Sequence, residues 1–360
     1  MSEGIPAMWM RGGTSKGLYF LKKDIPANKA KREQFLLSVF GTPDKLQING
    51  VGGGNPLTSK VAVVSKSTRP NVDVDYLFLQ VAVDDYVVSS TQNCGNILAG
   101  IAPFAIERGL LRPEKEKQKT SVRIFMENSR KVAIATVETP ESNLTYTGQT
   151  YIDGVAFPSA PISLEFLDIE GSLCGKLLPS GNPKDEVDGY SVTMIDNGMP
   201  CVIIEAGQLG LEGNENLEEL EKNCTLRESL ERLRLKCGKI MKLGNVKEKT
   251  VPKMTIVSKP LSNGMINTRT FIPHKCHHSI GVFGAISVAT ACLIEHTPAN
   301  NLSVIPSGEK KLCAIEHPSG KMEVLAELRN NKIISTAILR TARKLFDGVV
   351  FSNNDGLKAS

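Results

Sequence analysis

Short runs of alternating or β-branched apolar residues make up most of this chain, and Gly, Pro, Asn and Asp punctuate them. Such a pattern is typical of strands joined by turns. Two stretches, 29–40 and 214–242, carry instead the 3.6-residue periodicity of amphipathic surface helices. The strands that the pattern predicts most clearly are 61–64, 76–83, 122–126, 132–137, 202–205, 254–257 and 333–339.

Two further segments, 95–107 and 279–295, are apolar on every face. A helix of that composition must be buried all round. In a strand-rich domain, a curved sheet wrapped around the helix buries it on all sides, and small residues such as Gly100 and Gly284 permit close approach. We therefore predict an α+β fold with two similar domains, each a β-barrel-like curved sheet around one central buried helix.

The polar stretch 179–189, rich in Pro and Gly, separates the two apolar segments and is the predicted linker. The length of 360 residues also suggests two domains, at about 150 residues per domain. We place an N-terminal domain at 1–187, joined by a C-terminal strand at 345–360, and a C-terminal domain at 188–344.

Composition excludes several classes of function. With 41% hydrophobic and 22% charged residues, the chain is predicted to be soluble. Its 43 basic and 38 acidic residues give a net charge of +5, which suits a small anion, and the single Trp offers little for base stacking, so we expect no nucleic acid partner.

The chain is also expected not to associate with membranes. Its longest apolar runs, 97–106 and 280–294, contain Gly or Pro and fall short of the roughly 18 to 20 residues that a span requires. The first residues show no basic region followed by an apolar stretch, so we predict no secretory signal and a cytoplasmic protein.

Eight cysteines are present without a Cys-x-x-Cys pair, and we expect mostly free, buried thiols. Cys94 stands apart because it directly precedes one of the apolar helices. The free N–H groups at a helix start attract anions and stabilise a thiolate, so a reactive thiol is predicted there. A buried structural cysteine is the alternative.

Before the second apolar helix, 274–278 gathers three of the five histidines around Cys276. A metal site is one interpretation, although its ligands would crowd onto adjacent positions without a distant fourth partner. Anion contact is favoured, with Arg269 and His274 as candidates to contact substrate carboxylates and 277–278 as a helix cap. An interface or solvent role for each of these residues stays open.

Two glycine-rich loops, 10–17 and 51–60, both contain Thr-Ser-Lys. Neither is a phosphate loop of the ATPase kind, which needs Gly before the Lys and Ser or Thr after it. Backbone N–H groups, hydroxyls and a cation in one loop nevertheless form a cradle for a carboxylate, and a partly desolvated Lys60 could act as base or acid. The alternative is a pair of turns with solvated lysines.

Several short motifs occur in one order along almost the whole chain: 10–17 (MRGGTSKG), 58–62 (TSKVA), 93–96 (NCGN), 152–154 (IDG), 317–320 (HPSG) and 340–343 (RTAR) with Gly348. In this the sequence resembles the PrpF family of the diaminopimelate epimerase-like fold, which includes 2-methylaconitate isomerases, methylitaconate isomerases and 4-oxalomesaconate tautomerases. The longer strings 52–60 and 272–277 resemble the 4-oxalomesaconate tautomerase branch most closely.

The resemblance implies two similar domains with an active site in the cleft between the two helix starts, and no cofactor. It also implies that Lys60 and Cys94 form a proton-transfer pair. The candidates that it implies for carboxylate binding are Arg11, Gly12, Gly13, Thr14, Ser15, Ser59, Asn93, Gly95, Asn96, Arg269, His274 and Ser279. Epimerases of this fold have a second catalytic Cys where this chain has 279–284, so a two-thiol mechanism is disfavoured.

We therefore expect a cofactor-independent, metal-free isomerase that shifts a proton on an unsaturated tricarboxylate, first of all by keto-enol tautomerisation of 4-oxalomesaconate. A 2-methylaconitate or methylitaconate double-bond isomerase is the runner-up. A carboxylate-binding protein without turnover and a metal protein using 274–278 are the alternatives of another class. The expected partner is a small di- or tricarboxylate, and a homodimer is the candidate assembly.

Overall fold

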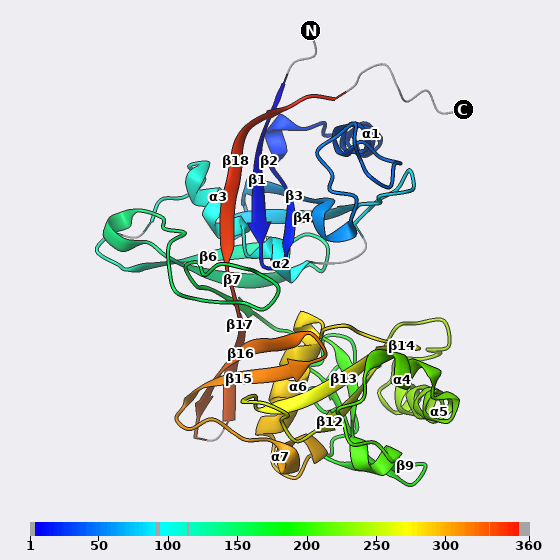
Figure 1. Ribbon diagram of the computed structural model, residues 1–360. Helices are drawn as coiled ribbons and strands as arrows, with labels where there is room; N and C mark the ends of the chain where they lie inside the picture. Colours follow the sequence, from blue (N-terminus) through cyan, green and yellow to red (C-terminus); the bar gives the residue numbers. More distant parts are fainter. Residues whose placement is uncertain (1–3, 91–93, 114, 331, 353–360) are drawn as a thin grey trace. The chain divides into compact units, whose positions relative to one another are not determined.

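The computed structural model describes residues 4–352 except 91–93, 114 and 331. The chain divides into two compact units (Figure 1). Unit 1 comprises Met1–Leu167 and Leu339–Ser360, and unit 2 comprises Asp168–Ile338. None of the helices in the described part of the chain has the length and hydrophobicity needed to cross a bilayer.

The division differs from the boundary expected near residue 187. The stretch 179–189 is part of unit 2, because it forms the strand β9 (Asp185–Val187), which pairs with β10 (Tyr190–Asp196). In addition, the Ser180 hydroxyl donates a hydrogen bond to Asp185 at 2.6 Å. Pro and Gly therefore mark tight turns within a unit here.

Unit 1 contains most of the first half of the chain and the last strand. Its strands are β1 (Ile5–Gly12), β2 (Ser15–Leu21), β3 (Lys60–Lys66), β4 (Val74–Val81), β5 (Val88–Ser89), β6 (Lys119–Met126), β7 (Lys131–Glu138), β8 (Ile162–Phe166) and β18 (Ala342–Val350), and its helices are α1 (Lys29–Phe40), α2 (Gly95–Leu98) and α3 (Ile101–Glu107). β18 pairs antiparallel with β1 and so returns the end of the chain to this unit.

Unit 2 contains the remaining elements. Besides β9 and β10, its strands are β11 (Pro200–Glu205), β12 (Lys253–Ser258), β13 (Ile266–Ile272), β14 (Lys275–Cys276), β15 (Lys310–His317), β16 (Gly320–Arg329) and β17 (Lys332–Arg340), and its helices are α4 (Leu217–Lys222), α5 (Cys224–Ile240), α6 (Val282–Leu293) and α7 (Pro298–Leu302).

The two units repeat one order of strand pairing. In unit 1, β1–β2 is antiparallel, β2–β3 parallel, β3–β4 antiparallel, β4–β6 parallel and β6–β7 antiparallel. In unit 2, the same alternation runs through β10–β11, β11–β12, β12–β13, β13–β15 and β15–β16. The helices interrupt both series at matching places, with α1 and α4–α5 before the third strand and α2–α3 and α6–α7 after the short hairpin strand.

Each unit buries a helical segment against several of its strands. α6 contacts β10, β11, β15 and β16, and its residues from Gly284 to Cys292 are all buried. In unit 1, α2 contacts β1, β2 and β3, while α3 contacts β3, β6 and β7. The predicted α+β fold, with a curved sheet around a buried helical segment in each of two similar units, is confirmed.

One predicted helix is divided in two. The segment 95–107 forms α2 and α3 with Ala99 and Gly100 between them. Pro103 has no N–H to donate to the carbonyl of Ala99, so the helical hydrogen bonding cannot continue there. At Gly100, a Cβ would lie 2.4 Å from the Tyr19 hydroxyl, so the chain needs glycine at this close approach.

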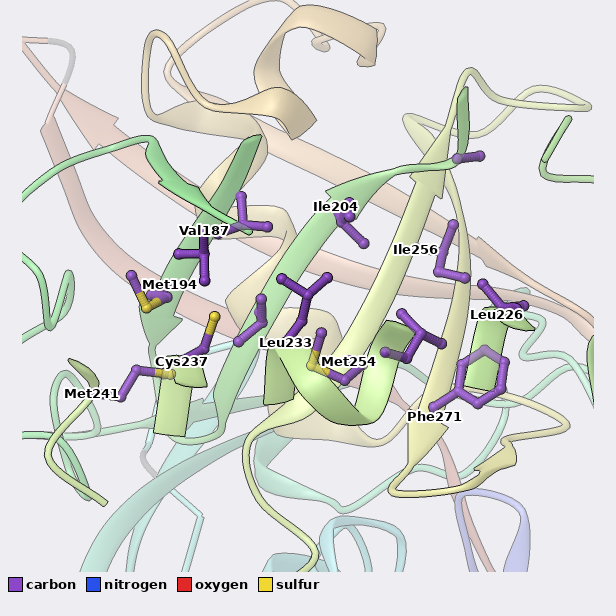
Figure 2. Packing of buried hydrophobic residues seen from close by; sticks show 14 of the residues in the cluster. Val187, Met194, Ile204, Leu226, Leu233, Cys237, Met241, Met254, Ile256 and Phe271 are labelled. Carbon is purple, nitrogen blue, oxygen red and sulfur yellow. The ribbon is translucent and has the colours of Figure 1, made fainter. Parts of the chain in front are cut away.

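The opposite face of each sheet carries an amphipathic helix. In unit 2, α5 packs through Leu226, Leu233 and Cys237 onto Met254 and Ile256 (Figure 2). In unit 1, α1 packs in the same way onto the face of β2 and β3 that carries Leu18, Phe20, Val61 and Val63. Because side chains alternate along a strand, residues 60, 62 and 64 of β3 and residues 253, 255 and 257 of β12 face the central helices instead.

Candidate functional site

Lys60 is the first residue of β3, on the face toward α2 and α3. The residue is buried, and its Nζ donates a 2.6 Å hydrogen bond to Oε1 of Gln80, which lies directly opposite on β4. Nζ also lies 5.2 Å from the centroid of the Phe78 ring. The amine is therefore held in one place by a neutral amide and an aromatic ring, and no carboxylate of the described residues pairs with it.

The Gln80 amide is itself fixed in orientation. Its Nε2 donates to the backbone carbonyls of Pro56, Ser59 and Val81 at 3.0, 2.9 and 3.2 Å. Three acceptors around the nitrogen leave the oxygen to face Lys60. Sequence reasoning missed Gln80, because the register that sets it opposite Lys60 depends on where the β3–β4 turn falls.

Gly17 of β2 pairs with Lys60 in the parallel β2–β3 ladder. A Cβ at Gly17 would lie 2.3 Å from the Lys60 backbone oxygen. The glycine therefore allows β2 and β3 to approach at the residue that carries the amine.

The turn between β1 and β2 lies against the start of α2. Gly13 has a φ of +50°, which favours glycine. A Cβ at Gly12 would lie 2.3 Å from the backbone oxygen of Asn96, and one at Gly13 would lie 2.2 Å from Asn96 Oδ1. Asn96 Nδ2 also donates to Thr14 Oγ1 at 3.0 Å. The structure thus brings together two motifs whose contacting residues, Thr14 and Asn96, are 82 residues apart in sequence.

Two predicted ligand atoms near this turn are enclosed and have no hydrogen-bond partner within the described residues. They are the Ser15 hydroxyl and Oδ1 of Asn96. A buried polar atom without a partner is costly, so atoms of this kind are suited to receive a hydrogen bond from, or give one to, a bound ligand.

The side chains of Arg11 and Ser59, by contrast, form hydrogen bonds with other residues of the protein. The Arg11 guanidinium donates to Gly13 O and Thr341 Oγ1, both at 2.9 Å, and to Ser159 Oγ at 3.1 Å. The fully buried Ser59 hydroxyl donates to Oε1 of Gln47 at 2.8 Å. These contacts brace the two glycine-rich loops, and a direct role of either side chain in carboxylate binding stays a prediction.

Cys94 is the N-cap residue of α2, and Gly95 is the first residue of that helix. The thiol has neighbours that the sequence did not indicate, namely the buried phenols of Tyr19 and Tyr76. Burial, followed by the charge of Cys94, raises the pKa of both phenols well above 10, so they remain neutral hydroxyls. Tyr19 donates to Ile97 O at 2.6 Å, whereas the enclosed Tyr76 hydroxyl has no partner within the described residues.

Asn93, another predicted ligand, lies outside the described residues.

In unit 2, Ser279 lies just before α6. Its backbone N–H donates to Nδ1 of His277 at 2.8 Å, and its hydroxyl lies 3.2 Å from Nε2 of His317. His317 is buried at the end of β15. Burial, together with the charges of His278 and Lys253, lowers the pKa of His277, so its imidazole is neutral near pH 7. His317 belongs to the motif 317–320, and the sequence alone gives no sign that it lies beside Ser279.

Arg269 lies on the other face of the unit 2 sheet. It shares its face of β13 with Phe271, which packs in the α5 cluster, and pairs across the ladder with Ile256 of the same cluster. Its guanidinium donates to Glu215 O and Asn267 Oδ1 at 3.1 and 2.9 Å. The alternation of side chains along β13 thus places Arg269 on the face of the sheet away from α6, and its role in carboxylate binding stays a prediction.

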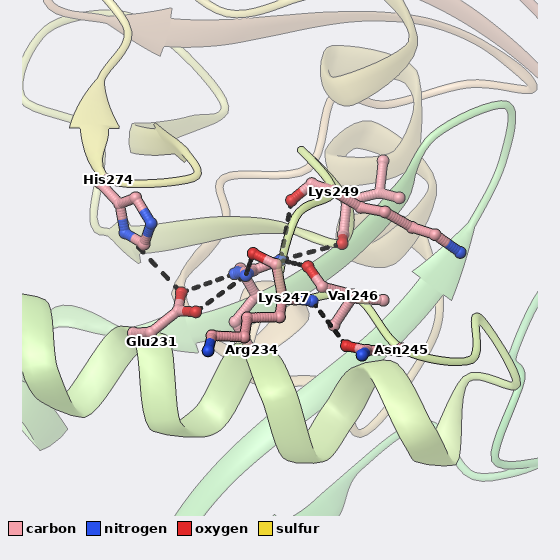
Figure 3. A network of polar contacts seen from close by, with 8 residues as sticks. Glu231, Arg234, Asn245, Val246, Lys247, Lys249 and His274 are labelled. Carbon is pink, nitrogen blue, oxygen red and sulfur yellow. Dashed lines mark hydrogen bonds and ion pairs between the residues drawn. The ribbon is translucent and has the colours of Figure 1, made fainter.

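His274 also lies with α5. It occupies the hairpin turn between β13 and β14, and its Nδ1 lies 3.8 Å from Glu231 (Figure 3). Glu231 in turn pairs with the fully buried Arg234 at 2.7 Å. A histidine beside an acidic side chain is poorly placed to contact a substrate carboxylate. The residues 274–278 therefore point to different partners, and the described residues contain no group of three or more metal-ligating side chains.

The arrangement in unit 1 combines three kinds of group: an amine, a thiol and neutral hydroxyl donors. The thiol lies at the N-cap of α2, and the other groups lie on the strands of the same unit. An amine and a thiol are groups that exchange protons near neutral pH when their environment is tuned, and neutral donors can stabilise a developing oxyanion. This chemistry suits a proton shift next to a carbonyl group.

Comparison with known proteins agrees with this reading. The family model described as PrpF protein matches residues 2–353. The chain is 55% identical over 350 residues to "(4E)-oxalomesaconate Delta-isomerase" of Novosphingobium sp. (strain KA1), covering 97% of this chain and 98% of that protein. It is 51% identical over 351 residues to "4-oxalomesaconate tautomerase" of Pseudomonas putida, covering 98% and 97%.

A solved structure is similar over the same extent. The crystal structure of methylitaconate-delta-isomerase aligns with a TM-score of 0.87 and 32% identity, covering 98% of this chain and 96% of that one. Family model, curated relatives and solved structure all span nearly the whole sequence. The chain belongs to the PrpF family.

Proposed function

We propose that this protein is an isomerase that shifts a proton on an unsaturated tricarboxylate, with 4-oxalomesaconate as substrate and keto-enol tautomerisation as the reaction. The observation that carries the substrate is the identity of 55% and 51% to two proteins named for oxalomesaconate, against 32% to the methylitaconate isomerase structure. The chemistry is supported by Lys60 and Cys94, which present an amine and a thiol to the same helical segment.

In the proposed reaction, one of these two groups removes a proton from the carbon next to the carbonyl, and the other returns a proton elsewhere on the conjugated system. The enolate formed in between carries negative charge that must be stabilised. The enclosed hydroxyls of Ser15 and Tyr76 are suited to donate to it, since neither has a partner among the described residues.

The test is turnover by purified protein with and without these groups. We expect the wild type to change the ultraviolet absorbance of 4-oxalomesaconate, and Lys60→Ala and Cys94→Ala to lose about 10²-fold or more of kcat, the usual share of a general acid or base. Matched controls are Lys66→Ala, at the exposed end of the same strand, and Cys224→Ala, an exposed free thiol. Both controls should keep wild-type rates.

Methylitaconate and 2-methylaconitate, followed by proton NMR, complete the substrate panel. Turnover of one of these and not of 4-oxalomesaconate would replace the proposed substrate within the same chemistry. Binding without turnover of any of the three would show a carboxylate-binding protein instead, and wild-type rates in Lys60→Ala or Cys94→Ala would move the site elsewhere.

A further inference from the structure

Unit 2 carries a lysine at the place that Lys60 occupies in unit 1. Lys60 is the first residue of β3, and Lys253 is the first residue of β12. The repeated strand order makes β3 and β12 equivalent. Each lysine also forms the first pair of a parallel ladder, with Gly17 in β2–β3 and with Cys201 in β11–β12.

Lys253 faces the central helix of its unit. Met254 and Ile256 of β12 pack in the α5 cluster, so Lys253 lies on the opposite face, toward α6. Cys201, its neighbour in the ladder, interacts with Ser287 of α6, which agrees with that orientation. Lys253 thus provides a cation on the α6 face, whereas Arg269 lies on the α5 face.

The ammonium of Lys253 has no hydrogen bond or ion pair with any described residue, although the residue is only 9% exposed. Burial raises the pKa of Cys201 to about 12, so the thiol is neutral and provides no counter-charge. The other nearby cation, Arg234, is paired with Glu231. A buried charge without a partner is unfavourable, and an anion brought to it would relieve that cost.

Lys253 differs from Lys60 at one decisive position. Lys60 donates to the amide of Gln80, the residue opposite it in the antiparallel ladder. In unit 2, Met254 pairs with Phe271, so the next residue pair sets Ile272 opposite Lys253. An isoleucine offers no acceptor, which leaves Lys253 able to donate all its protons to a ligand.

The surroundings of Lys253 favour a carboxylate among the possible anions. Its charge acts on His277, which accepts from the backbone N–H of Ser279 just before α6. An ammonium with free protons can donate to both oxygens of a carboxylate.

We propose that Lys253 binds a carboxylate, as the unit 2 counterpart of Lys60 with a binding role in place of proton transfer. This inference rests on the function proposed above for the class of its ligand, a di- or tricarboxylate.

The test uses the full-length protein and tricarballylate, a saturated tricarboxylate that has neither the double bond nor the keto group needed for turnover. Calorimetric titration at pH 7 should show a dissociation constant at least 10-fold higher for Lys253→Met than for the wild type, and Lys253→Arg should recover part of the loss. The matched control is Lys259→Met, which removes the same charge from an exposed residue just after the same strand. Its dissociation constant should not change.

A wild-type measurement covers the case in which Lys253→Met fails to fold. The ¹³Cε resonance of Lys253, assigned by comparison with Lys253→Arg, should titrate at a higher pH with saturating tricarballylate than without it, because a bound carboxylate favours the charged amine. Unchanged titration in the wild type, or a wild-type dissociation constant in folded Lys253→Met, would overturn the inference.

Turnover and binding, measured separately, distinguish this inference from the proposed function. If the wild type turns over 4-oxalomesaconate and Lys253→Met raises the dissociation constant for tricarballylate about 10-fold, both hold. Turnover by the wild type, with a wild-type dissociation constant for tricarballylate in Lys253→Met, removes the role of Lys253 alone. Binding of tricarballylate that depends on Lys253, without turnover of any substrate, removes the enzymatic function and leaves the carboxylate site.

Discussion

Among the described residues, Lys60 is held by an amide and not by a carboxylate, and this contact bears on the proton transfer that we propose for Lys60. A carboxylate at 2.6 Å would favour the charged ammonium and hinder its deprotonation. The Gln80 oxygen accepts a hydrogen bond from either the ammonium or the neutral amine, so it fixes the position of Nζ throughout a catalytic cycle.

Replacing Gln80 by Met should therefore lower kcat with little change in KM. A hydrogen bond to a charged group contributes about 1.5–3 kcal/mol, which corresponds to roughly a 10- to 100-fold loss of rate at about 1.4 kcal/mol per factor of ten. Steady-state kinetics with 4-oxalomesaconate would measure this fall in kcat. Gln118→Met, at an exposed glutamine of the same unit, is the control, and equal rates in both variants would contradict a positioning role.

Lys253 should also be recognisable by its effect on stability. Burial lowers the pKa of Lys253 below its ordinary value of 10.5, so the charged amine is less favourable in the folded than in the unfolded chain. This destabilisation is complete below the folded pKa and vanishes above 10.5. Lys253→Met should thus unfold at a higher urea concentration than the wild type at pH 7, and the gain should shrink toward pH 10.

A lysine with a purely structural role would give the opposite result, because its removal would lower the urea midpoint. Lys259→Met provides the reference, since its exposed side chain should leave the midpoint unchanged at both pH values. Residues that bind ligands at the expense of stability are common at functional sites.

Among the helices, α5 depends on one buried side chain that ties it to the following loop. The fully buried Arg234 forms two hydrogen bonds with Glu231 and donates to the carbonyls of Val246, Lys249 and Val251 (Figure 3). The guanidinium therefore satisfies loop carbonyls that would otherwise be enclosed without a donor.

Arg234→Met should lower the free energy of unfolding of unit 2 by about 3–5 kcal/mol, the cost of removing one partner of a buried ion pair. Arg232→Met is the matched control on the same helix, because Arg232 is about half exposed in its pair with Asp188 and such surface pairs contribute about 0–1 kcal/mol. Hydrogen exchange of the α5 amides would distinguish Arg234→Met from Arg232→Met. Equal exchange rates in both variants would show that the loop is held by other contacts.

The chain as a whole closes on itself through its last strand. β1 lies between β2 and β18, and it pairs with β18 from Ile5↔Val350 to Gly12↔Ala342. Unit 1 thus depends on residues that follow all of unit 2 in sequence.

A chain ending at residue 338 should keep unit 2 and lose the integrity of unit 1. β1 would become an edge strand with unpaired backbone groups, so its amides should exchange about tenfold faster or more, and turnover should disappear because Lys60 and Cys94 lie in this unit. A chain ending at residue 352 retains every described strand and is the control. Slow exchange in β1 of the shorter chain would refute this dependence.

Local patterns determined a large part of this fold. The 3.6-residue periodicity predicted 29–40, which is α1, and the burial demanded by an all-apolar segment predicted the central helix α6. Both results follow from side-chain hydrophobicity along short stretches. The order of short motifs along the chain pointed to the family, and the resemblance in turn implied Lys60 and Cys94.

Only the tertiary structure decided which face of a sheet each side chain occupies and what lies opposite it. A shift of one residue moves a strand residue to the other face, so Arg269 could be expected beside α6 while it lies with α5, and Lys253 could be overlooked. Gln80 lies opposite Lys60, twenty residues away in sequence, because of the register between β3 and β4. Pairing between distant segments depends on strand register and chain return, which no local pattern encodes.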